Sequence, residues 1–352
     1  MSSIVHFAIV GAGMIARFHA NSMKIVPNVR LAGFYDINHE SAKRLAEEFN
    51  CKAYSSAEEL WQDSTVQAIT IATPSGLHSE IAVAAARAGK HILCEKPLDV
   101  TRPKVLKMLQ ECQQNNVFLV PVFQSRFSPE TQKIKYAMQQ GRFGKMLFAS
   151  ARMPWFRSEE YYASSSWRGT WSMDGGGALM NQAIHTVDQL IFINGLPESV
   201  FSYAATRTHN IEVEDNLCAA IRYNNGSFGT FEASTSCSPG YPKRLEFTGT
   251  TGSVILEEDR FVRWEFENMT EDDKAVTLQL SNISNSGGSD PTKIPSQGHA
   301  VQIADLAEAI LTGKEPMITP QEGYQTMEFI WGIYESERTG KPYNFNFSEL
   351  FQ

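Results

Sequence analysis

The residues with the clearest chemical potential lie in two short segments, Glu95-Lys96-Pro97 and the run that carries Asn181 and His185. Oxidation of an alcohol releases a hydride and a proton, so a site for this chemistry needs a base that titrates near neutral pH. The imidazole of His185 titrates in that range without perturbation. The ammonium group of Lys96 would do so if burial and a neighbouring cation lowered its pKa. We therefore interpret Lys96 and His185 as candidate proton-transfer groups.

Asn181 belongs to the same candidate catalytic site. Asn181 and His185 are four residues apart in a helical pattern, so they share one face, and the glycines at 175–177 let this helix start approach a ligand closely. An amide can orient a hydroxyl or the imidazole, but it holds no proton-linked charge. The alternatives are a surface charge in a turn for Lys96 and a hydrogen-bonded core histidine for His185.

A glycine-rich turn near the N-terminus predicts a dinucleotide site. The apolar strand at 7–10 ends in Gly11 and Gly13, which allow a tight turn and the close approach of a pyrophosphate. The phosphates would then bind free N–H groups at the start of the following helix, at Met14 and Ile15. An ordinary strand-to-helix turn is the alternative for this motif taken alone.

Asp36 favours NAD over NADP as the cofactor. It ends the second strand, at 29–35, and its carboxylate can accept hydrogen bonds from both hydroxyls of an adenosine ribose. A 2′-phosphate at that place would be repelled by the like charge, and residues 37–39 contain no arginine to offset the repulsion. The sequence therefore predicts NAD as the cofactor, with NADP less favoured.

The first third of the chain alternates strand and helix patterns. Further strands are predicted at 52–54, 66–72, 91–94 and 117–123, and helices at 41–50, 78–88 and 101–115, with one more after Ser56. This alternation predicts a parallel doubly wound sheet, which binds ligands at the carboxyl ends of its strands. The loops at these ends should border the cofactor, and they contain Thr73, Pro74, His78, Glu95, Lys96 and Pro97. Helix capping is an alternative role for His78.

Beyond residue 123 the pattern changes to longer alternating runs. These predict a mostly antiparallel sheet with strands at 146–153, 200–207, 216–223, 227–234, 244–248, 254–256 and 261–266. Helical patterns at 179–194, 301–311 and 323–339 can cover its apolar face, and the tract at 281–298 is predicted to be a loop. We therefore expect an NAD(P)-binding domain at 1–123 and an α+β domain for substrate binding and oligomerisation at 124–352.

Aromatic and arginine side chains gather in the sequence just before the glycine run. Aromatic rings stack on the C–H faces of sugars, and arginine pairs with carboxylate or phosphate groups. The cluster favours a pyranose as the substrate and leaves a uronate or a nucleotide sugar open. The alternative role of these residues is to line a sheet edge or a subunit contact. The candidate substrate-binding residues are Trp155, Arg157, Tyr162, Trp167 and Arg168, together with Lys96, Asn181 and His185.

The composition argues against several classes of protein. The 352 residues carry a net charge of −8 without long basic runs, which argues against a nucleic-acid partner. No apolar run is long enough for a membrane span, and the first strand begins too early to leave room for a signal peptide, so we expect a cytoplasmic protein. The five cysteines are scattered without C-x-x-C spacing, which suggests neither disulfides nor a metal site.

The glycine turn, Glu95-Lys96-Pro97 and the run from 175 to 185 together resemble the glucose–fructose oxidoreductase, inositol dehydrogenase and MocA family. The resemblance covers almost the whole chain and extends to His19, to Asp188, for which we expect a structural role, and to the run at 299–336. It implies NAD(P)-dependent oxidoreductases of sugars, cyclitols and related polyols. It also implies a Rossmann domain and an open-faced sheet domain, often assembled as homodimers or homotetramers through that sheet.

The resemblance further implies a triad of lysine, aspartate and histidine, in which this chain has Asn181 at the aspartate position. The leading interpretation is hydride transfer between the nicotinamide and a hydroxyl or keto carbon of a sugar, sugar derivative or cyclitol. Some relatives instead retain NAD and cleave glycosides by transient oxidation and elimination. The amide at position 181 also leaves open a cofactor-sensing protein without catalysis.

Overall fold

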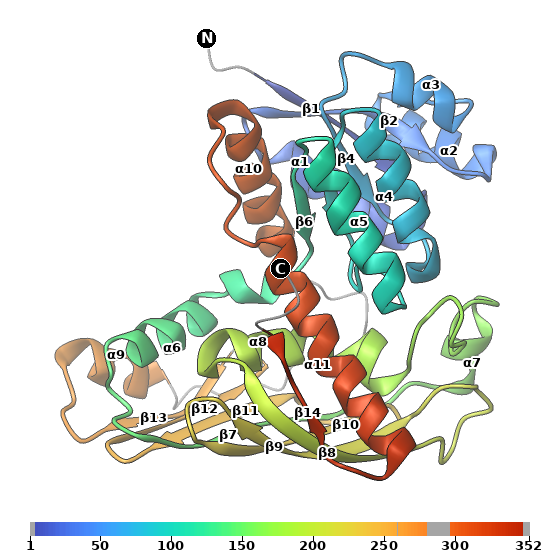
Figure 1. Ribbon diagram of the computed structural model, residues 1–352. Helices are drawn as coiled ribbons and strands as arrows, with labels where there is room; N and C mark the ends of the chain where they lie inside the picture. The colour runs from blue at the N-terminus through green and yellow to red at the C-terminus, as the bar shows by residue number, and fades with distance from the viewer. Residues whose placement is uncertain (1–3, 259, 280–295, 348–352) are drawn as a thin grey trace. The chain divides into compact units, whose positions relative to one another are not determined.

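The computed structural model describes residues 4–258, 260–279 and 296–347 (Figure 1). Contacts divide the described residues into two compact units. The first unit contains residues 4–124, 172–175 and 296–324, and the second contains residues 125–171, 176–258, 260–279 and 325–347. This division differs from a single boundary after residue 123, because two segments from later in the chain cluster with the first unit.

The first unit is built on a parallel sheet with the strand order β3-β2-β1-β4-β5-β6. The strands are β1 (Val5–Val10), β2 (Val29–Tyr35), β3 (Lys52–Ala53), β4 (Ala68–Ile71), β5 (His91–Cys94) and β6 (Leu119–Pro121). The helices are α1 (Met14–Lys24), α2 (His39–Phe49), α3 (Ala57–Gln62), α4 (His78–Arg87), α5 (Arg102–Gln114) and α10 (Ser296–Thr312). The strand order reverses at β1, which confirms the predicted doubly wound sheet and marks the carboxyl ends of β1 and β4 as the ligand-binding edge.

The position of helix α10 corrects one expectation. From the sequence, we expected the helix at 301–311 to cover the apolar face of the second sheet. The apolar residues of α10, among them Ala300, Ile303 and Leu306, join the core that α1 forms over β1 and β2 (Figure 1). The assignment was wrong because periodicity shows that a helix has an apolar face, but it does not identify the sheet that this face covers.

The second unit is built on a sheet with the order β13-β12-β11-β7-β10-β9-β8-β14, in which β7 and β10 pair in parallel and the other described pairs are antiparallel. The strands are β7 (Met146–Pro154), β8 (Pro197–Ala205), β9 (Asn216–Tyr223), β10 (Phe228–Ser234), β11 (Arg244–Gly249), β12 (Gly252–Glu257), β13 (Arg260–Phe266) and β14 (Tyr343–Asn344). The helices are α6 (Pro129–Gln139), α7 (Glu159–Ala163), α8 (Ile184–Asn194), α9 (Glu271–Gln279) and most of α11 (Pro320–Thr339). The predicted mostly antiparallel sheet is confirmed.

Helices pack on one face of this sheet. Helix α8 contacts β7 and β11, and the Ser202 hydroxyl of β8 donates a hydrogen bond to the Ile333 carbonyl of α11 (2.7 Å). Large side chains remain exposed on the strands, with Phe148 at 56%, Phe228 at 51% and Tyr203 at 68% of full exposure. The sheet therefore has the open face that the resemblance implied.

The connections show where local sequence signals were sufficient. The turn at 224–226 joins β9 to β10 and has Gly226 at a φ of +84°, as its glycine predicts. Helix α6 and strand β14 were not predicted, and most of the predicted loop at 281–298 lies outside the described residues, with 296–298 in α10. Among the helices that the structure describes, none has the length and apolar character to cross a membrane.

Candidate active site

The glycine turn connects β1 to α1. Gly11 has a φ of +103°, and a Cβ there would lie 2.5 Å from the Ala72 carbonyl oxygen, so the backbone conformation and the packing both require glycine. Gly13 precedes α1 without a side-chain cap, and a Cβ on it would meet nothing within 4 Å. Helix α1 begins beside this open space, and the N–H groups of Met14 and Ile15 have no acceptor within the helix. These N–H groups can therefore bind a pyrophosphate.

Asp36 follows β2 and contacts the glycine turn directly. Its Oδ2 accepts a hydrogen bond from the Ala12 N–H (2.7 Å), and its Oδ1 accepts one from the Asn38 N–H (2.7 Å). These two bonds fix the orientation of the carboxylate. Because each oxygen has a second lone pair, both can still accept a ribose hydroxyl.

His78 ties together the two loops that were predicted to border the cofactor. Its Nδ1 lies 2.8 Å from the Pro97 carbonyl oxygen, and its Nε2 lies 2.9 Å from the Thr73 carbonyl oxygen. The His78 ring is buried, and both of its nitrogens contact backbone carbonyl oxygens. His78 therefore holds the two loops in place. The Thr73 hydroxyl, in contrast, is buried without a hydrogen-bond partner among the described residues, and so can serve a ligand.

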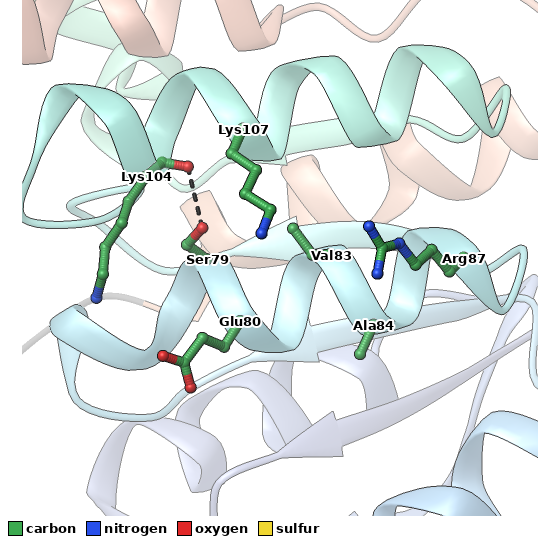
Figure 2. Close-up of a pocket in the computed structure, with 7 residues that line it drawn as sticks. All are labelled: Ser79, Glu80, Val83, Ala84, Arg87, Lys104 and Lys107. Carbon is green, nitrogen blue, oxygen red and sulfur yellow. Dashed lines mark hydrogen bonds between the residues drawn. The ribbon is translucent and has the colours of Figure 1, made fainter.

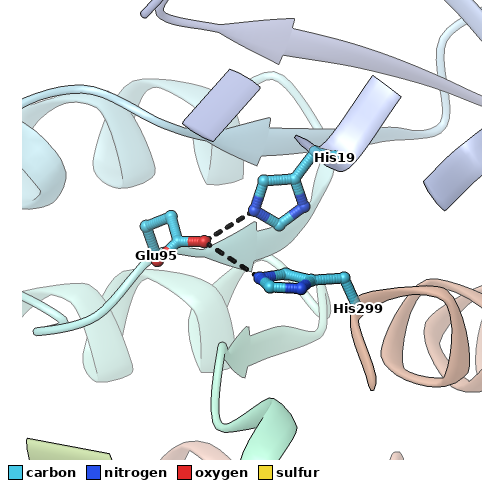
Figure 3. A group of neighbouring side chains, drawn as sticks. All are labelled: His19, Glu95 and His299. Carbon is cyan, nitrogen blue, oxygen red and sulfur yellow. Dashed lines mark hydrogen bonds and ion pairs between the residues drawn. The ribbon is translucent and has the colours of Figure 1, made fainter. Parts of the chain in front are cut away.

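Glu95 is the centre of a buried cluster with His19 and His299 (Figure 3). The Nε2 of His19 lies 2.7 Å from Glu95 Oε1, and the Nε2 of His299 lies 3.8 Å from the same oxygen. The three residues come from α1, the end of β5 and α10, which are distant in sequence. No local signal in the sequence predicted this cluster, because periodicity does not show that α10 packs beside α1.

The protonation states of the cluster follow from its geometry. Burial alone would raise the pKa of Glu95, but the hydrogen bond from His19 and the neighbouring imidazole of His299 hold it well below its usual range. Burial lowers the pKa of His19, so we assign a neutral imidazole that donates through Nε2 to an ionised Glu95. The Nδ1 atom of His19 is buried without a hydrogen-bond partner among the described residues, which agrees with a ring that is protonated at Nε2 alone.

The same three donors could in principle hold a metal ion, because their ligand atoms lie within 4.8 Å of one another. Tetrahedral ligation at about 2.0–2.2 Å would separate the ligand atoms by about 3.4 Å. The 2.7 Å between His19 and Glu95 is instead an ordinary hydrogen-bond distance. We therefore assign the cluster as a hydrogen-bonded network.

Lys96 continues the chain directly from Glu95. The backbone N–H of Lys96 donates to Glu95 Oε2 (3.2 Å), so the buried carboxylate fixes the backbone from which the lysine side chain extends. The Lys96 side chain is half-buried, whereas Pro97 is buried. His19 and His299 therefore act on the Lys96 segment indirectly, through their contacts with the Glu95 carboxylate.

In the second unit, Asn181 and His185 lie on consecutive helical segments. Residues Ala178–Ala183 form a π-helical turn that contains Asn181, and α8 follows with His185 as its second residue. Both side chains are half-buried. A Cβ on Gly177 would overlap the Glu214 carbonyl oxygen, so this glycine lets the turn pack against the strand that follows.

Glu214 stabilises the π-helical turn through hydrogen bonds to its backbone. Its carboxylate accepts hydrogen bonds from the N–H groups of Gly177 (3.1 Å) and Leu179 (2.8 Å) and from the Tyr334 hydroxyl (3.0 Å). Burial raises the pKa of Glu214 to about 7, against these hydrogen bonds. Sequence reasoning missed this residue, because a glutamate before a strand does not reveal what its side chain reaches.

The aromatic and arginine residues at 155–168 that were predicted to bind substrate lie close together in the second unit. Arg157 and Arg168 both pack on the ring of Tyr161, at 5.5 Å and 4.5 Å from its centroid. Trp155 contacts Arg157, and Trp167 contacts Arg168. Tyr162 is buried and bonds through its hydroxyl to Thr235 (2.8 Å). Its neighbour Tyr161, which was not among the candidates, contacts both arginines, and the two tyrosine rings lie 5.2 Å apart.

A concave feature lies between α4 and α5 (Figure 2). Two of the three cations that line it are already engaged, since Arg87 pairs with Glu111 (2.5 Å) and the Lys104 ammonium donates to the Gly76 carbonyl (2.6 Å). It lies along helices and away from the carboxyl ends of the strands, where doubly wound sheets bind ligands. We therefore do not place the reaction there.

The fold and these residues define a class of protein, the nicotinamide-dependent oxidoreductases with a Rossmann domain and an open-faced sheet domain. Residues 5–123 match the model of the oxidoreductase family with an NAD-binding Rossmann fold, and residues 131–255 match the GFO/IDH/MocA C-terminal domain. The chain belongs to the GFO/IDH/MocA family. It is an NAD(P)-dependent dehydrogenase of the sugar and cyclitol type, and NAD is its cofactor.

Relatives with known activities agree with this assignment. Myo-inositol 2-dehydrogenase of Thermotoga maritima is 27% identical over 73% of this chain and 76% of its own length. Trans-1,2-dihydrobenzene-1,2-diol dehydrogenase of Mus musculus is 30% identical over 72% of this chain and 75% of its own length. The crystal structure of the WlbA dehydrogenase from Bordetella pertussis with NADH and UDP-GlcNAcA is 29% identical, with a TM-score of 0.88 and coverage of 97% and 99%.

Proposed function

We propose that the protein transfers a hydride between NAD and a hydroxyl or keto carbon of a sugar, sugar derivative or cyclitol. The observation that carries this proposal is Lys96, held at the end of β5 by the Glu95 cluster. Gly11, Gly13, Met14 and Ile15 would hold the pyrophosphate of NAD, and Asp36 would hold its ribose. When bound, NAD supplies the hydride acceptor, and the chain itself has to manage the proton.

Lys96 and His185 are the groups that we propose for the proton. Either side chain can exchange a proton with a substrate hydroxyl. An imidazole ordinarily titrates near neutrality, whereas a lysine needs burial or a neighbouring cation to bring its pKa into that range. Asn181 would orient the substrate or the imidazole, since its amide can donate and accept a hydrogen bond but cannot carry the charge. Thr73 and Pro74, beside Glu95 and Pro97, would border the nicotinamide end of the cofactor.

The test is a screen of neutral sugars, inositols, sugar acids and nucleotide sugars, followed by NADH absorbance. We expect at least one of these substrates to give stoichiometric NADH. Release of phenol from nitrophenyl glycosides without net NADH would instead indicate elimination chemistry. Binding of NADH without turnover of any substrate, in either direction, would indicate a cofactor-sensing protein.

Asp36 should make the protein prefer NAD. A 2′-phosphate near the oriented carboxylate would cost on the order of 1 to 4 kcal/mol by Coulomb repulsion. We expect at least about tenfold tighter binding of NADH than of NADPH, which corresponds to about 1.4 kcal/mol. Fluorescence titrations with the two cofactors should be made at the same pH and salt concentration, because salt screens the repulsion. Asp36→Ala should narrow the ratio, and an unmutated protein that favours NADPH would refute the ribose assignment.

We also propose that the protein is a homodimer or homotetramer that assembles through the open face of the second sheet. Phe148 of β7 and Phe228 of β10 are partners in the strand register, so the two exposed rings form one apolar patch. An apolar patch of this kind favours association over exposure to water. Light scattering should give a dimer or tetramer at micromolar protein, and Phe148→Glu should shift it toward the monomer. A monomeric unmutated protein would contradict the proposal.

A further inference from the structure

The second unit contains two guanidinium groups that share one aromatic ring. Arg157 packs on Trp155 and Tyr161, with its Cζ 4.9 Å and 5.5 Å from the ring centroids. Arg168 packs on Tyr161 and Trp167, at 4.5 Å and 4.7 Å. Arg157 is only 5% exposed, whereas Arg168 is half-buried. The structure thus places two positive charges close together, with one of them removed from water.

Neither guanidinium has an anionic partner within 4.0 Å among the described residues. Arg157 donates to the Gln182 side-chain oxygen (3.0 Å) and the Phe156 carbonyl (2.9 Å), and Arg168 donates to the Tyr161 hydroxyl (2.7 Å). All three acceptors are neutral. By comparison, the buried Arg126 pairs with Asp188 at 2.7 Å. A buried charge without a counter-ion is unfavourable, so this cluster is suited to an anion that the chain itself does not supply.

Two buried donors in the same cluster remain unused. The Arg168 Nε and the Trp155 Nε1 are buried without a hydrogen-bond partner among the described residues. Both atoms can only donate, so a ligand that satisfies them has to bring acceptors. Burial lowers the pKa of Arg157, and a bound anion would raise that pKa again. Excess positive charge and unused donors together specify an oxyanion.

The cluster is connected to the proposed catalytic segment by one side chain. Gln182 accepts from Arg157 and donates to the Tyr161 hydroxyl (2.9 Å) and to the Asn181 side-chain oxygen (2.7 Å). The oxyanion site therefore adjoins Asn181 on the π-helical turn, directly before α8. A ligand in contact with Asn181 would bring its own acidic group to the two arginines.

We propose that Arg157 and Arg168 bind the carboxylate of a sugar acid, so that the substrate is a uronate, free or within a nucleotide sugar. This proposal rests on the function proposed above for the same site. A planar carboxylate matches the guanidinium donors in pairs, and the aromatic rings of Trp155 and Trp167 can pack on the pyranose. A sugar phosphate would use the same donors, and the experiment separates the two.

The test compares matched pairs that differ at one group, D-glucuronate with D-glucose and UDP-glucuronate with UDP-glucose, with D-glucose 6-phosphate as the phosphate arm. We expect kcat/KM for a uronate to exceed that of its neutral partner by at least about tenfold, because bonds to charged groups are worth about 10- to 100-fold each. Arg168→Gln should reduce this ratio about 10-fold or more. Arg338→Gln, whose side chain is 70% exposed on α11, should leave the ratio unchanged.

Equilibrium binding separates the failure of this proposal from the failure of the proposed function. Calorimetric titration of the NADH-loaded protein with each ligand needs no turnover, and Arg157→Gln, which removes a buried group, is used only if its circular dichroism matches the unmutated protein. Uronate binding without turnover would support the oxyanion site and count against hydride transfer. Equal affinity for neutral and acidic partners, or uronate binding unaffected by Arg168→Gln, would overturn the proposal. Preference for the sugar phosphate over the uronate would overturn the carboxylate assignment.

Discussion

Lys96→Met should lower kcat by about 10²- to 10⁴-fold while NADH still binds with its original affinity. Methionine keeps the length and apolar stem of lysine but cannot exchange a proton. The Lys96 backbone N–H donates to Glu95, so the substitution keeps this hydrogen bond and the contact between Glu95 and His19. Stopped-flow turnover and NADH fluorescence titration, made on the same preparation, measure the two quantities separately.

Two variants make this test specific. His185→Ala removes the other proposed proton group and should reduce kcat within the same range, again with NADH affinity retained. Lys314→Met is the matched control, because its side chain is 76% exposed and far from either loop in sequence. Loss of NADH binding that parallels the loss of turnover in Lys96→Met would show that the lysine holds the dinucleotide instead. Full activity in both active-site variants would remove them from the mechanism.

The parts of the site that the sequence predicts are those fixed by local geometry. A glycine at 11 follows from a turn that requires a positive φ, and Asp36 follows from the end of a strand that neighbours this turn. The parallel doubly wound character of the first sheet follows from alternating strand and helix patterns. In each case a few residues in sequence determine the feature, so no distant contact has to be known.

The unpredicted parts depend on which distant segments meet. His299 joins Glu95 only because α10 packs on α1, and periodicity gives no information about that choice. Tyr161 and Tyr162 are adjacent in sequence, yet one hydroxyl bonds to Arg168 and the other to Thr235. Which of them joins the arginine cluster depends on the path of a short helix, α7, that the sequence did not indicate.

Asp188→Ala should have the largest effect on stability, a loss of about 3–5 kcal/mol in the free energy of unfolding of the second unit. Asp188, on α8, is fully buried and accepts two hydrogen bonds from Arg126, from Nε to Oδ2 (2.8 Å) and from a terminal nitrogen to Oδ1 (2.7 Å). The Thr326 hydroxyl of α11 also donates to Oδ1 (3.0 Å). Removing the carboxylate leaves the buried guanidinium, which is 4% exposed, without its counter-ion. Urea unfolding followed by fluorescence measures the change.

The cost of an uncompensated charge can be distinguished from the net contribution of the pair. Arg126→Met together with Asp188→Leu removes both charges and fills the space with apolar groups, so we expect the double variant to recover most of the stability that Asp188→Ala loses. Glu335→Ala breaks the exposed pair with Arg338 and should change the free energy by at most about 1 kcal/mol. If Asp188→Ala were as mild as Glu335→Ala, the buried pair would not stabilise the unit. If the double variant were as unstable as the single one, the pair itself, rather than the avoidance of a lone buried charge, would hold α8 against the turn that contains Arg126.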